Sequence, residues 1–420
     1  MGGNQGYGHL LLLDILGSYS SGEECFMKIL LFNSLYYPNI TGGAELSAQL
    51  LAEGLKSKGI EPVVVCTAEQ NRTDFVNGLK VYYLRTPNLY WPCRQEQNFL
   101  KKILWHSIDS CNFAIKKQVQ KIIDFEKPDI AHTNNLAGFS VYLWKLLNKN
   151  HLPIVHTIRD LYLLCPRSNM FKHGRSCRMQ CLNCKLFSFP RKALSRYVDE
   201  AVGISRFILD FHLRGGYFPK AAATSVIPNP LPGNNGAAGE RTPSKGNRLR
   251  FGFVGSLSEH KGIEILLQQF SRLDADLVVF GKSLVPDYQR QLELKYGRPN
   301  ILFKGWESDI AKIYRDMDVL IVPSLWNEAF GRVVIEAFSF GIPVICSNKG
   351  GLPELIEHGI TGWVYDSDNA AQLRKTVEYV INKPQIVSQM SSVCIEQAGR
   401  FAVDAITEKY IEVFSRVLDK

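Results

Sequence analysis

Short apolar runs alternate with longer segments of helical period along most of the chain. The first series of runs predicts strands at residues 28–33, 61–67, 130–133, 154–158 and 201–204, with an amphipathic helix at residues 43–58. The second series predicts strands at residues 249–254, 277–280, 301–303, 319–322 and 343–346. Unalternated Val, Ile and Leu are expected in strands that helices cover on both faces. The pattern therefore predicts an α/β protein with two doubly wound, Rossmann-like parallel sheets.

The stretch between the two series divides the chain into domains. Residues 232–248 are rich in Gly, Asn and Pro and lack an apolar period, which predicts a linker between an N-terminal domain, 27–231, and a C-terminal domain, 249–403. Residues 404–420 have helical spacing behind Asp404, a favourable N-cap. Residues 1–26 have no basic residue ahead of their apolar piece, so we interpret them as a disordered extension and not as a secretory signal.

Composition and charge narrow the class of protein. The chain has 420 residues, of which 45% are hydrophobic and 21% charged, as in ordinary globular proteins. The net charge is +9, and Lys and Arg outnumber Asp and Glu by 21 to 9 between residues 94 and 220. This basic region predicts an anionic partner such as a membrane surface, with a solvated lysine face as the alternative. No helix-turn-helix, zinc-finger or RNP pattern accompanies the charge, so we expect no nucleic acid partner.

Two glutamates eight positions apart are the strongest chemical signal. Glu328 follows an apolar strand and a Pro-Ser turn, while residues 333–340 have the helix period and place Glu336 on the first turns of a helix. Backbone N–H groups and the positive end of the helix dipole converge at such a loop, which binds phosphates and other anions. The two carboxylates can accept hydrogen bonds from sugar and ribose hydroxyls. The segment thus predicts a nucleotide-sugar site, with two solvated surface charges as the alternative.

Two further helix starts carry related signals. Gly42 and Gly43 run directly into the first helix without the Gly-x-Gly-x-x-Gly fingerprint, which argues against a nicotinamide-dependent enzyme. Lys261 precedes the helical run 263–270, where a cation is unfavourable unless an anion binds beside it. A surface lysine at a loosely capped helix is the alternative.

These motifs occur in an order that is similar to a known family. The block from Asp318 to Gly362 resembles the donor-binding segment of glycosyltransferase family 4, retaining enzymes of the GT-B fold, and the likeness runs from about Met27 to the end. The resemblance implies that Glu328 holds donor-sugar hydroxyls, that Glu336 holds the ribose, and that the last helix crosses back to the N-terminal domain. It also implies a donor site that includes Gly42, Gly43, Ser205, Ser256, Lys261, Ala329, Phe330 and Gly331.

Two positions depart from the family pattern. Ser256 stands where the family has an arginine that grips the diphosphate, and Arg159 stands where it commonly has a histidine. We expect Arg159 to reach the diphosphate and to replace the missing charge, with Asp160 orienting it or binding acceptor hydroxyls. The predicted catalytic groups are therefore Lys261, Glu328, Arg159 and Asp160. The alternative is that Arg159 and Asp160 only pair with each other.

Four cysteines cluster in a basic insert, residues 165–184. Their spacing, Cys165, Cys177, Cys181 and Cys184, predicts a structural zinc site with four thiolate ligands. Four reduced thiols and disulfides are the alternatives. The other cysteines fall in or near predicted strands and helices, as in a cytosolic protein. The insert resembles that of a family subgroup in which it lies over the acceptor side.

The motifs and the resemblance together predict a retaining hexosyltransferase. It would move a sugar from a nucleotide-diphosphate sugar to a hydroxyl of a glycan or lipid-linked acceptor, in cell-surface polysaccharide or glycolipid synthesis. No Asp-x-Asp pair stands in the Lys261 loop or between Glu328 and Glu336, so we expect no metal or other cofactor for the chemistry. The expected place is the cytoplasm, at the inner membrane face. A non-catalytic GT-B binding protein and a sugar-nucleotide epimerase on the same fold are the alternatives.

Overall fold

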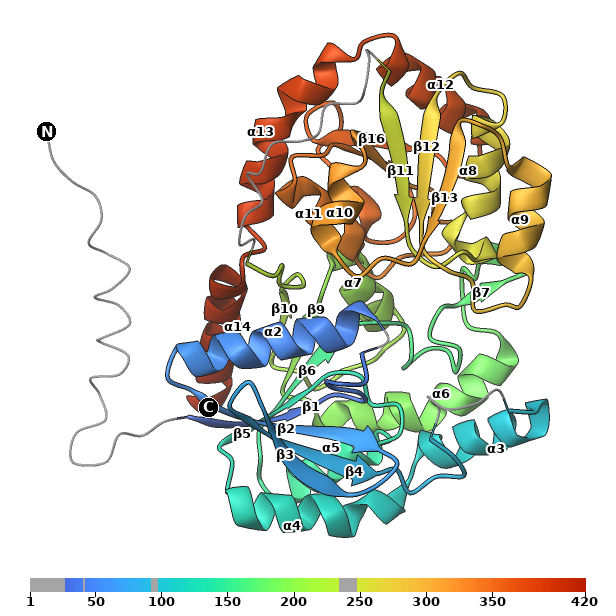
Figure 1. The fold of residues 1–420 in the computed structure, drawn as a ribbon. Coiled ribbons are helices and arrows are strands. Elements are labelled where there is room, and N and C mark those ends of the chain that lie inside the picture. The colour runs from blue at the N-terminus through green and yellow to red at the C-terminus, as the bar shows by residue number, and fades with distance from the viewer. Residues whose placement is uncertain (1–26, 41, 92–96, 234–247) are drawn as a thin grey trace, which may run out of the picture.

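Two α/β domains stand one above the other in Figure 1, the N-terminal domain below and the C-terminal domain above. The structure is a computed structural model and describes residues 27–40, 42–91, 97–233 and 248–420. The proposed extension, 1–26, and nearly all of the proposed linker lie outside these residues.

The N-terminal sheet has eight strands in the order β10-β9-β6-β5-β1-β2-β4-β3. Neighbouring strands are parallel except for β3 and β4, an antiparallel hairpin that the apolar pattern did not predict. Its strands are β1 (Lys28–Phe32), β2 (Glu61–Ala68), β3 (Arg72–Val76), β4 (Leu79–Arg85), β5 (Ile130–Thr133), β6 (Ile154–Ile158), β9 (Glu200–Gly203) and β10 (Ala223–Val226). The central strands are buried along their length, as unalternated apolar strands require.

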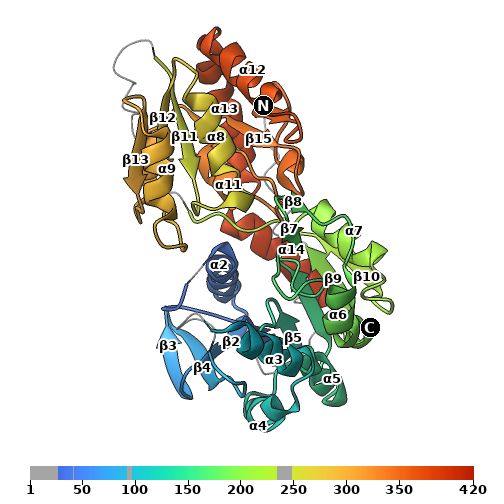
Figure 2. The same ribbon diagram turned by 90° about the vertical axis from the view of Figure 1, so that its right-hand side faces the viewer.

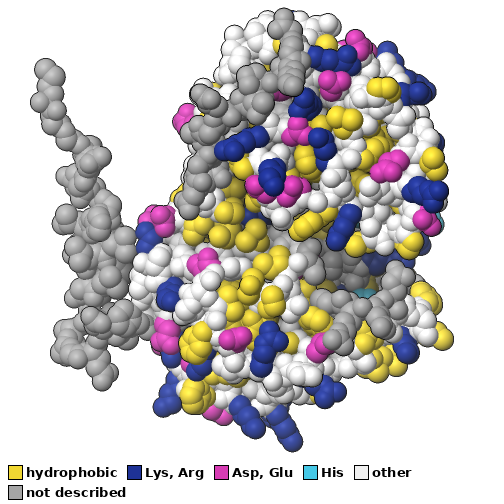
Figure 3. Space-filling view, in the orientation of Figure 1, with side chains coloured by type: hydrophobic (Ala, Val, Ile, Leu, Met, Phe, Trp, Pro, Cys, Tyr) yellow, Lys and Arg dark blue, Asp and Glu magenta, His cyan; other side chains and the backbone are white. Residues whose placement is uncertain are grey.

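Helices cover both faces of this sheet (Figure 2). They are α2 (Gly43–Ser57), α3 (Phe99–Ser110), α4 (Lys116–Glu126), α5 (Tyr142–Lys149), α6 (Leu182–Leu194) and α7 (Arg206–Arg214). The cysteine-rich insert contributes a small antiparallel hairpin, β7 (Phe171–Lys172) and β8 (Arg175–Ser176). Basic side chains lie along the lower edge of the domain, in the region of α4 (Figure 3).

The C-terminal sheet has six parallel strands in the order β13-β12-β11-β14-β15-β16. They are β11 (Arg250–Val254), β12 (Asp276–Phe280), β13 (Ile301–Gly305), β14 (Val319–Val322), β15 (Val344–Ser347) and β16 (Gly362–Tyr365). The helices of this domain are α8 (Ile263–Phe270), α9 (Tyr288–Tyr296), α10 (Ile310–Arg315), α11 (Arg332–Ser339), α12 (Ala370–Ile381) and α13 (Gln385–Gly399). The strands predicted for both domains are confirmed to within one or two residues.

The last helix, α14 (Val403–Leu418), packs on the N-terminal sheet beside α2. Its apolar face, including Ile406 and Phe414, forms a core with residues of β1, β6 and β9. The hydroxyl groups of Thr157 and Tyr410 form a hydrogen bond of 3.0 Å. Leu231 N–H donates to Phe401 O at 2.7 Å, so the two crossings between the domains run side by side. Among the described helices, none is both long and apolar enough to cross a membrane.

Candidate active site between the two domains

Loops from the carboxyl ends of both sheets meet where the two domains face each other. In the C-terminal sheet, β11 lies between β12 and β14, so the strand order reverses at the β11 and β14 pair. Open α/β sheets bind ligands at such a switch point, outside the carboxyl ends of the strands. The loop after β11 carries Ser256 and Lys261, and the loop after β14 carries Glu328. The topology therefore brings together three of the predicted site residues.

Lys261 and Glu328 form an ion pair at the center of this site. Lys261 Nζ lies 2.7 Å from Glu328 Oε1, which also accepts a hydrogen bond from Ser324 Oγ at 2.7 Å. The ammonium group lies 5.0 Å from the center of the Trp326 ring. Burial alone would raise the pKa of Glu328, but Lys261 and Ser324 outweigh it and hold that pKa below its usual range. Glu328 is thus an ionised carboxylate that is 8% exposed.

Two glycines allow the backbone to pass close to the loop that carries Glu328. Gly262 has φ +73°, and a Cβ there would lie 1.9 Å from Pro323 O, at the end of the neighbouring strand. Gly350 has φ +65°, and a Cβ there would lie 2.1 Å from Glu328 O. Any other residue would be strained at both positions and would push the loops apart. The glycine turn after β15 therefore supports the backbone of Glu328.

Glu336 is held by two partners from its own domain. Arg332 Nε lies 2.8 Å from Glu336 Oε1, and the Tyr314 hydroxyl donates to Oε2 at 2.9 Å. Burial raises the pKa of Glu336, although both partners favour its charged form. Gly331, with φ +120°, caps the start of α11 and leaves Arg332 as its first residue. The predicted helix position of Glu336 is confirmed, and its side chain is oriented by Arg332 and Tyr314.

Arg332 is a site residue that the sequence reasoning missed. Its Nη1 donates to Ser47 Oγ at 3.1 Å and to Pro230 O at 3.2 Å, both in the N-terminal domain. Its side chain lies against Gly43, where a Cβ would be 3.0 Å from Arg332 Cδ. The Nη2 group is buried and has no hydrogen-bond partner among the described residues. A cation at the start of a helix, the signal used for Lys261, would have identified it.

Arg159 lies in the loop after β6 and is buried. Its Nε donates to Asn134 Oδ1 at 2.8 Å, and its Nη1 donates to Asn229 Oδ1 at 2.6 Å. Its Nη2 group, like that of Arg332, is buried without a partner in the described part of the chain. Asp160 does not pair with Arg159 but accepts the Tyr162 N–H at 2.7 Å, and burial raises the pKa of Asp160 to about 6. The alternative of an isolated Arg–Asp pair does not fit these contacts.

Several residues that were predicted to bind the donor substrate contact other parts of the protein. Ser205 Oγ donates to Ala329 O at 2.7 Å across the domains and caps α7 by accepting the Ile208 N–H. Ser256 Oγ lies 3.2 Å from Ser258 Oγ. Gly42 N–H donates to Glu45 Oε2 at 2.9 Å at the start of α2. The Ser205 contact joins the two domains, and the Gly42 contact stabilises the start of α2.

Glu354 joins the domains at a second helix start. Its two carboxylate oxygens accept the backbone N–H groups of Arg206 and Phe207 at 2.7 and 2.6 Å. A carboxylate at the N-terminus of α7 is favourable because of the helix dipole. This residue, which the sequence reasoning also missed, links the glycine turn after β15 to the N-terminal domain.

The cysteine-rich insert reaches across to the C-terminal domain beside the Lys261 loop (Figure 2). Ser176 Oγ donates to Leu325 O at 3.2 Å, and the Phe171 ring lies 6.1 Å from that of His260. The described residues do not support the predicted zinc site. Its four cysteines are free thiols, with Cys165 buried and Cys181 exposed at the start of α6. No group of three or more His, Cys, Asp or Glu in the described residues is arranged to hold a metal ion.

Comparisons with known proteins cover both domains. Residues 41–232 match the family described as Glycosyltransferase Family 4, and residues 238–400 match Glycosyl transferases group 1. An uncharacterized 42.6 kDa protein in the cps region of Klebsiella pneumoniae is 34% identical over 397 residues, which cover 92% of this chain and 100% of that protein. An uncharacterized glycosyltransferase of Methanocaldococcus jannaschii is 38% identical over 81% of this chain and 85% of its own length.

Solved structures share the arrangement of the two domains. Anabaena HepE in complex with UDP and glucose has a TM-score of 0.66 at 20% identity, covering 93% of this chain and 99% of that one. Sucrose-phosphate synthase from Thermosynechococcus elongatus has a TM-score of 0.72 at 19% identity, with 94% and 99% covered. Because these two proteins are only 20% and 19% identical to the chain, their similarity shows a shared fold alone. The chain therefore belongs to glycosyltransferase family 4, and its two domains have the GT-B fold.

Proposed function

We propose that the protein transfers a sugar from a nucleoside-diphosphate sugar to a hydroxyl of a glycan or lipid-linked acceptor, with retention of the anomeric configuration. The observation that carries this proposal is the ion pair of Lys261 and Glu328 at the switch point of the C-terminal sheet. The UDP and glucose bound by HepE support the class of donor, and the cps region of the Klebsiella relative supports a role in cell-surface polysaccharide or glycolipid synthesis.

In this proposal each group of the site has one task. Glu328 accepts hydrogen bonds from donor-sugar hydroxyls, and Glu336 accepts those of the ribose. Lys261 and the backbone at Phe330 and Gly331 hold the diphosphate at the start of α11. The bond from the anomeric carbon to the phosphate oxygen breaks, and the acceptor oxygen bonds to that carbon on the same face. The acceptor proton passes to the leaving phosphate, so a nucleoside diphosphate is released.

The positive charge for the leaving group comes, in our proposal, from two arginines. Ser256 offers a hydroxyl without charge, whereas Arg159 and Arg332 each keep a buried Nη2 group without a partner in the described residues. Arg332 also touches Gly43. We expect Gly43 and the neighbouring Gly42 to face the diphosphate. Three protein cations can therefore balance the charge for which other enzymes use a metal ion. We propose a metal-independent reaction on this basis.

We place the reaction in the cytoplasm because of the chain's cysteine chemistry. The sequence has ten cysteines, and seven of the described ones form no disulfide, namely Cys66, Cys111, Cys346 and the four of the insert. Unpaired cysteines persist in a reducing compartment, whereas secreted proteins commonly oxidise them.

A donor screen tests the proposed function. Thermal unfolding is followed with a panel of nucleotide sugars, since a ligand at about 100 times its Kd stabilises a protein by about 2.7 kcal/mol. The donor that raises the Tm is then incubated with and without EDTA, and the released sugar is examined by NMR. We expect slow release of nucleoside diphosphate, retained configuration and no effect of EDTA. Epimerised donor would support the epimerase alternative, and binding without any release would support a binding protein.

The two arginines are tested separately by Arg159→Lys and Arg332→Lys. Each should lower turnover by about 10²- to 10³-fold, as the loss of one preorganised charge contact commonly does. Arg374→Lys is the control, because Arg374 is exposed on α12, in the C-terminal domain, and pairs there with Glu378 one turn along the helix. If Arg159→Lys lowers the Tm but leaves turnover near normal, Arg159 only joins Asn134 to Asn229.

A further inference from the structure

Eight large apolar side chains stand exposed on two helices of the N-terminal domain. They are Phe99, Leu100, Ile103 and Leu104 on α3, and Met179, Leu182, Leu186 and Phe189 on or just before α6. Six of them expose between 71% and 81% of their surface. Single exposed apolar residues are normal, but a contiguous group of this size marks an interaction surface. We call these eight residues the apolar platform.

The residues of the apolar platform share one face of each helix. On α3 they are spaced by three and four positions, and on α6 Leu182, Leu186 and Phe189 lie at i, i+4 and i+7. Other positions of the same helices, such as Trp105 and Arg191, are buried in the domain. The helices lie side by side in Figure 1, and Ser110 Oγ donates to Phe187 O at 3.2 Å. The two faces thus belong to one surface.

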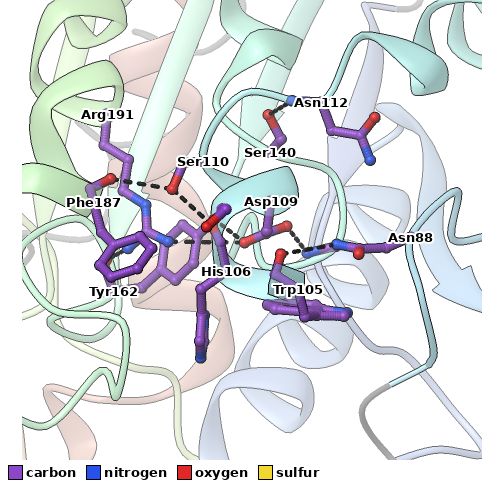
Figure 4. Close-up of polar contacts among 12 residues, drawn as sticks. Asn88, Trp105, His106, Asp109, Ser110, Asn112, Ser140, Tyr162, Phe187 and Arg191 are labelled. Atoms are coloured by element: carbon purple, nitrogen blue, oxygen red, sulfur yellow. Dashed lines mark hydrogen bonds and ion pairs between the residues drawn. The ribbon is translucent and has the colours of Figure 1, made fainter. Parts of the chain in front are cut away.

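A buried polar network holds the two helices together (Figure 4). Asp109 of α3 accepts hydrogen bonds from the Tyr162 hydroxyl and from Gly138 N–H. The Arg191 guanidinium of α6 lies 3.9 Å from Asp109 Oδ2, and its center is 3.8 Å from the Tyr162 ring. Asp109 and Arg191 are both fully buried. The exposure of the platform is therefore a property of well-packed helices and not of loosely attached ones.

The exposed charges on α3, on α6 and in the described residues just before α6 are of one sign. Exposed basic side chains lie between or beside its residues, namely Lys101, Lys102, Arg178, Lys185 and Lys192. The only acidic residue on either helix is Asp109, which is buried. A partner must therefore offer an apolar interior and a negatively charged surface. An anionic lipid bilayer offers both, because Leu and Phe enter the acyl boundary while Lys and Arg meet the headgroups.

We propose that the apolar platform docks the protein on an anionic lipid bilayer. A second copy of the chain fits less well, because the same lysines would then face each other across the interface. Tyr162, which bonds to Asp109, also donates its backbone N–H to Asp160 in the loop beside Arg159. Tyr162 thus links α3, which carries half of the apolar platform, to the loop of Arg159 and Asp160. The docking itself does not depend on the proposed chemistry.

Vesicle sedimentation tests this proposal with the full-length protein. Vesicles of phosphatidylcholine alone are compared with vesicles of equal parts phosphatidylcholine and phosphatidylglycerol. The double variant Leu100→Glu/Leu186→Glu removes one platform residue from each helix and adds two negative charges. The matched control is Leu294→Glu on α9, which is 79% exposed in the other domain. Circular dichroism melting checks that every variant is folded.

We expect the wild-type protein and Leu294→Glu to sediment with the anionic vesicles and to be released by salt. The double variant should bind them at least about tenfold more weakly, because each leucine loses its apolar transfer energy and each glutamate is repelled. Wild-type protein that stays in the supernatant, or equal binding by the double variant, would overturn the proposal. A dimer that the double variant converts to a monomer in light scattering would show that a second copy covers the platform.

Discussion

The Lys261–Glu328 pair yields the sharpest test of the site, a double-mutant cycle. Lys261→Met removes the ammonium group while its apolar stem still reaches the Trp326 ring, and Glu328→Gln removes the opposite charge at nearly constant shape. The double variant removes both. Urea unfolding measures the free energy of unfolding, and release of nucleoside diphosphate measures turnover with the identified donor.

The magnitude follows from the burial of the two groups. Breaking a fully buried pair costs about 3–5 kcal/mol, because one charge is left without its partner. Glu328 is 8% exposed, but the Lys261 side chain is 26% exposed, so we expect about 2 kcal/mol for Lys261→Met after screening. Glu328→Gln should cost less, since the ammonium can turn to water. The two changes should couple by about 1–2 kcal/mol.

The stability loss should also depend on pH, with a defined sign. The pKa of Glu328 is lowered in the folded protein, so the pair contributes stability above the unfolded pKa and loses it as pH falls through the folded pKa. Burial raises the pKa of Glu328, and Lys261→Met removes the cation that lowers it, so the pKa of Glu328 should rise in this variant. The difference between wild type and Lys261→Met should therefore shrink toward acidic pH, where the carboxylate is neutral in both.

Turnover decides whether Lys261 has more than a structural role. Loss of a cation that stabilises the leaving phosphate should lower kcat by about 10²- to 10³-fold, or about 3–4 kcal/mol. If Lys261→Met loses about 2 kcal/mol of stability yet turns over within about threefold of wild type, Lys261 is only the partner of Glu328 and our reasoning fails.

Three further predictions use other groups of the structure. Glu336→Gln should raise the donor KM more than it lowers kcat, as loss of a uniform binding contact does. Glu354→Ala should lower the free energy of unfolding by about 1 kcal/mol, because the start of α7 loses its capping carboxylate. The same change separates α7 from the other domain and should increase the radius of gyration in X-ray scattering. The control Glu357→Ala should do neither. Burial raises the pKa of Asp109 to about 6, so the folded protein holds this proton more tightly than the unfolded chain does. The free energy of unfolding of the wild type should therefore fall by about 3 kcal/mol between about pH 4 and above pH 6. Asp109→Asn should lack this loss.

Each of these outcomes has a contradicting result. A kcat loss without a KM change would make Glu336 a group that acts in the transition state. Equal scattering of Glu354→Ala and wild type would mean that Ser205 and Arg332 suffice to hold the domains together. Parallel pH profiles for Asp109→Asn and wild type would mean that Asp109 is ionised in the folded protein and that Arg191 compensates for its burial.

Local signals explain what could be predicted from the sequence. Buried parallel strands are continuous apolar runs, so the strands could be predicted. Helix starts carry glycine, serine or an unexpected cation, and these signals indicated Lys261 and the Glu328 loop as candidate site residues. The β3–β4 hairpin was missed although Asn77 and Gly78, both with positive φ, form the dipeptide that favours such turns. An apolar period also cannot distinguish a buried face from an exposed one, and for this reason α3 and α6 gave no warning of the apolar platform.

The missed site residues depend on contacts between distant parts of the chain. Arg332 bonds to Ser47, 285 positions away, and Glu354 bonds to Arg206, 148 positions away. Neither contact exists until the two domains face each other, so the sequence shows neither partner, and only Arg332 carries a local signal, as a cation at the start of α11. The zinc prediction stays unsupported, because close spacing of cysteines in the sequence does not by itself arrange their sulfur atoms as metal ligands, and no such group stands among the described residues.

The position of α14 has a consequence for the order of events during synthesis. One face of the N-terminal sheet, formed by residues such as Ile29, Val155 and Val202, is covered by Ile406, Tyr410 and Phe414. These three residues leave the ribosome only after the whole C-terminal domain has been made. The N-terminal domain is therefore translated first but completes its core last, and until then its nascent sheet offers an uncovered apolar face to chaperones.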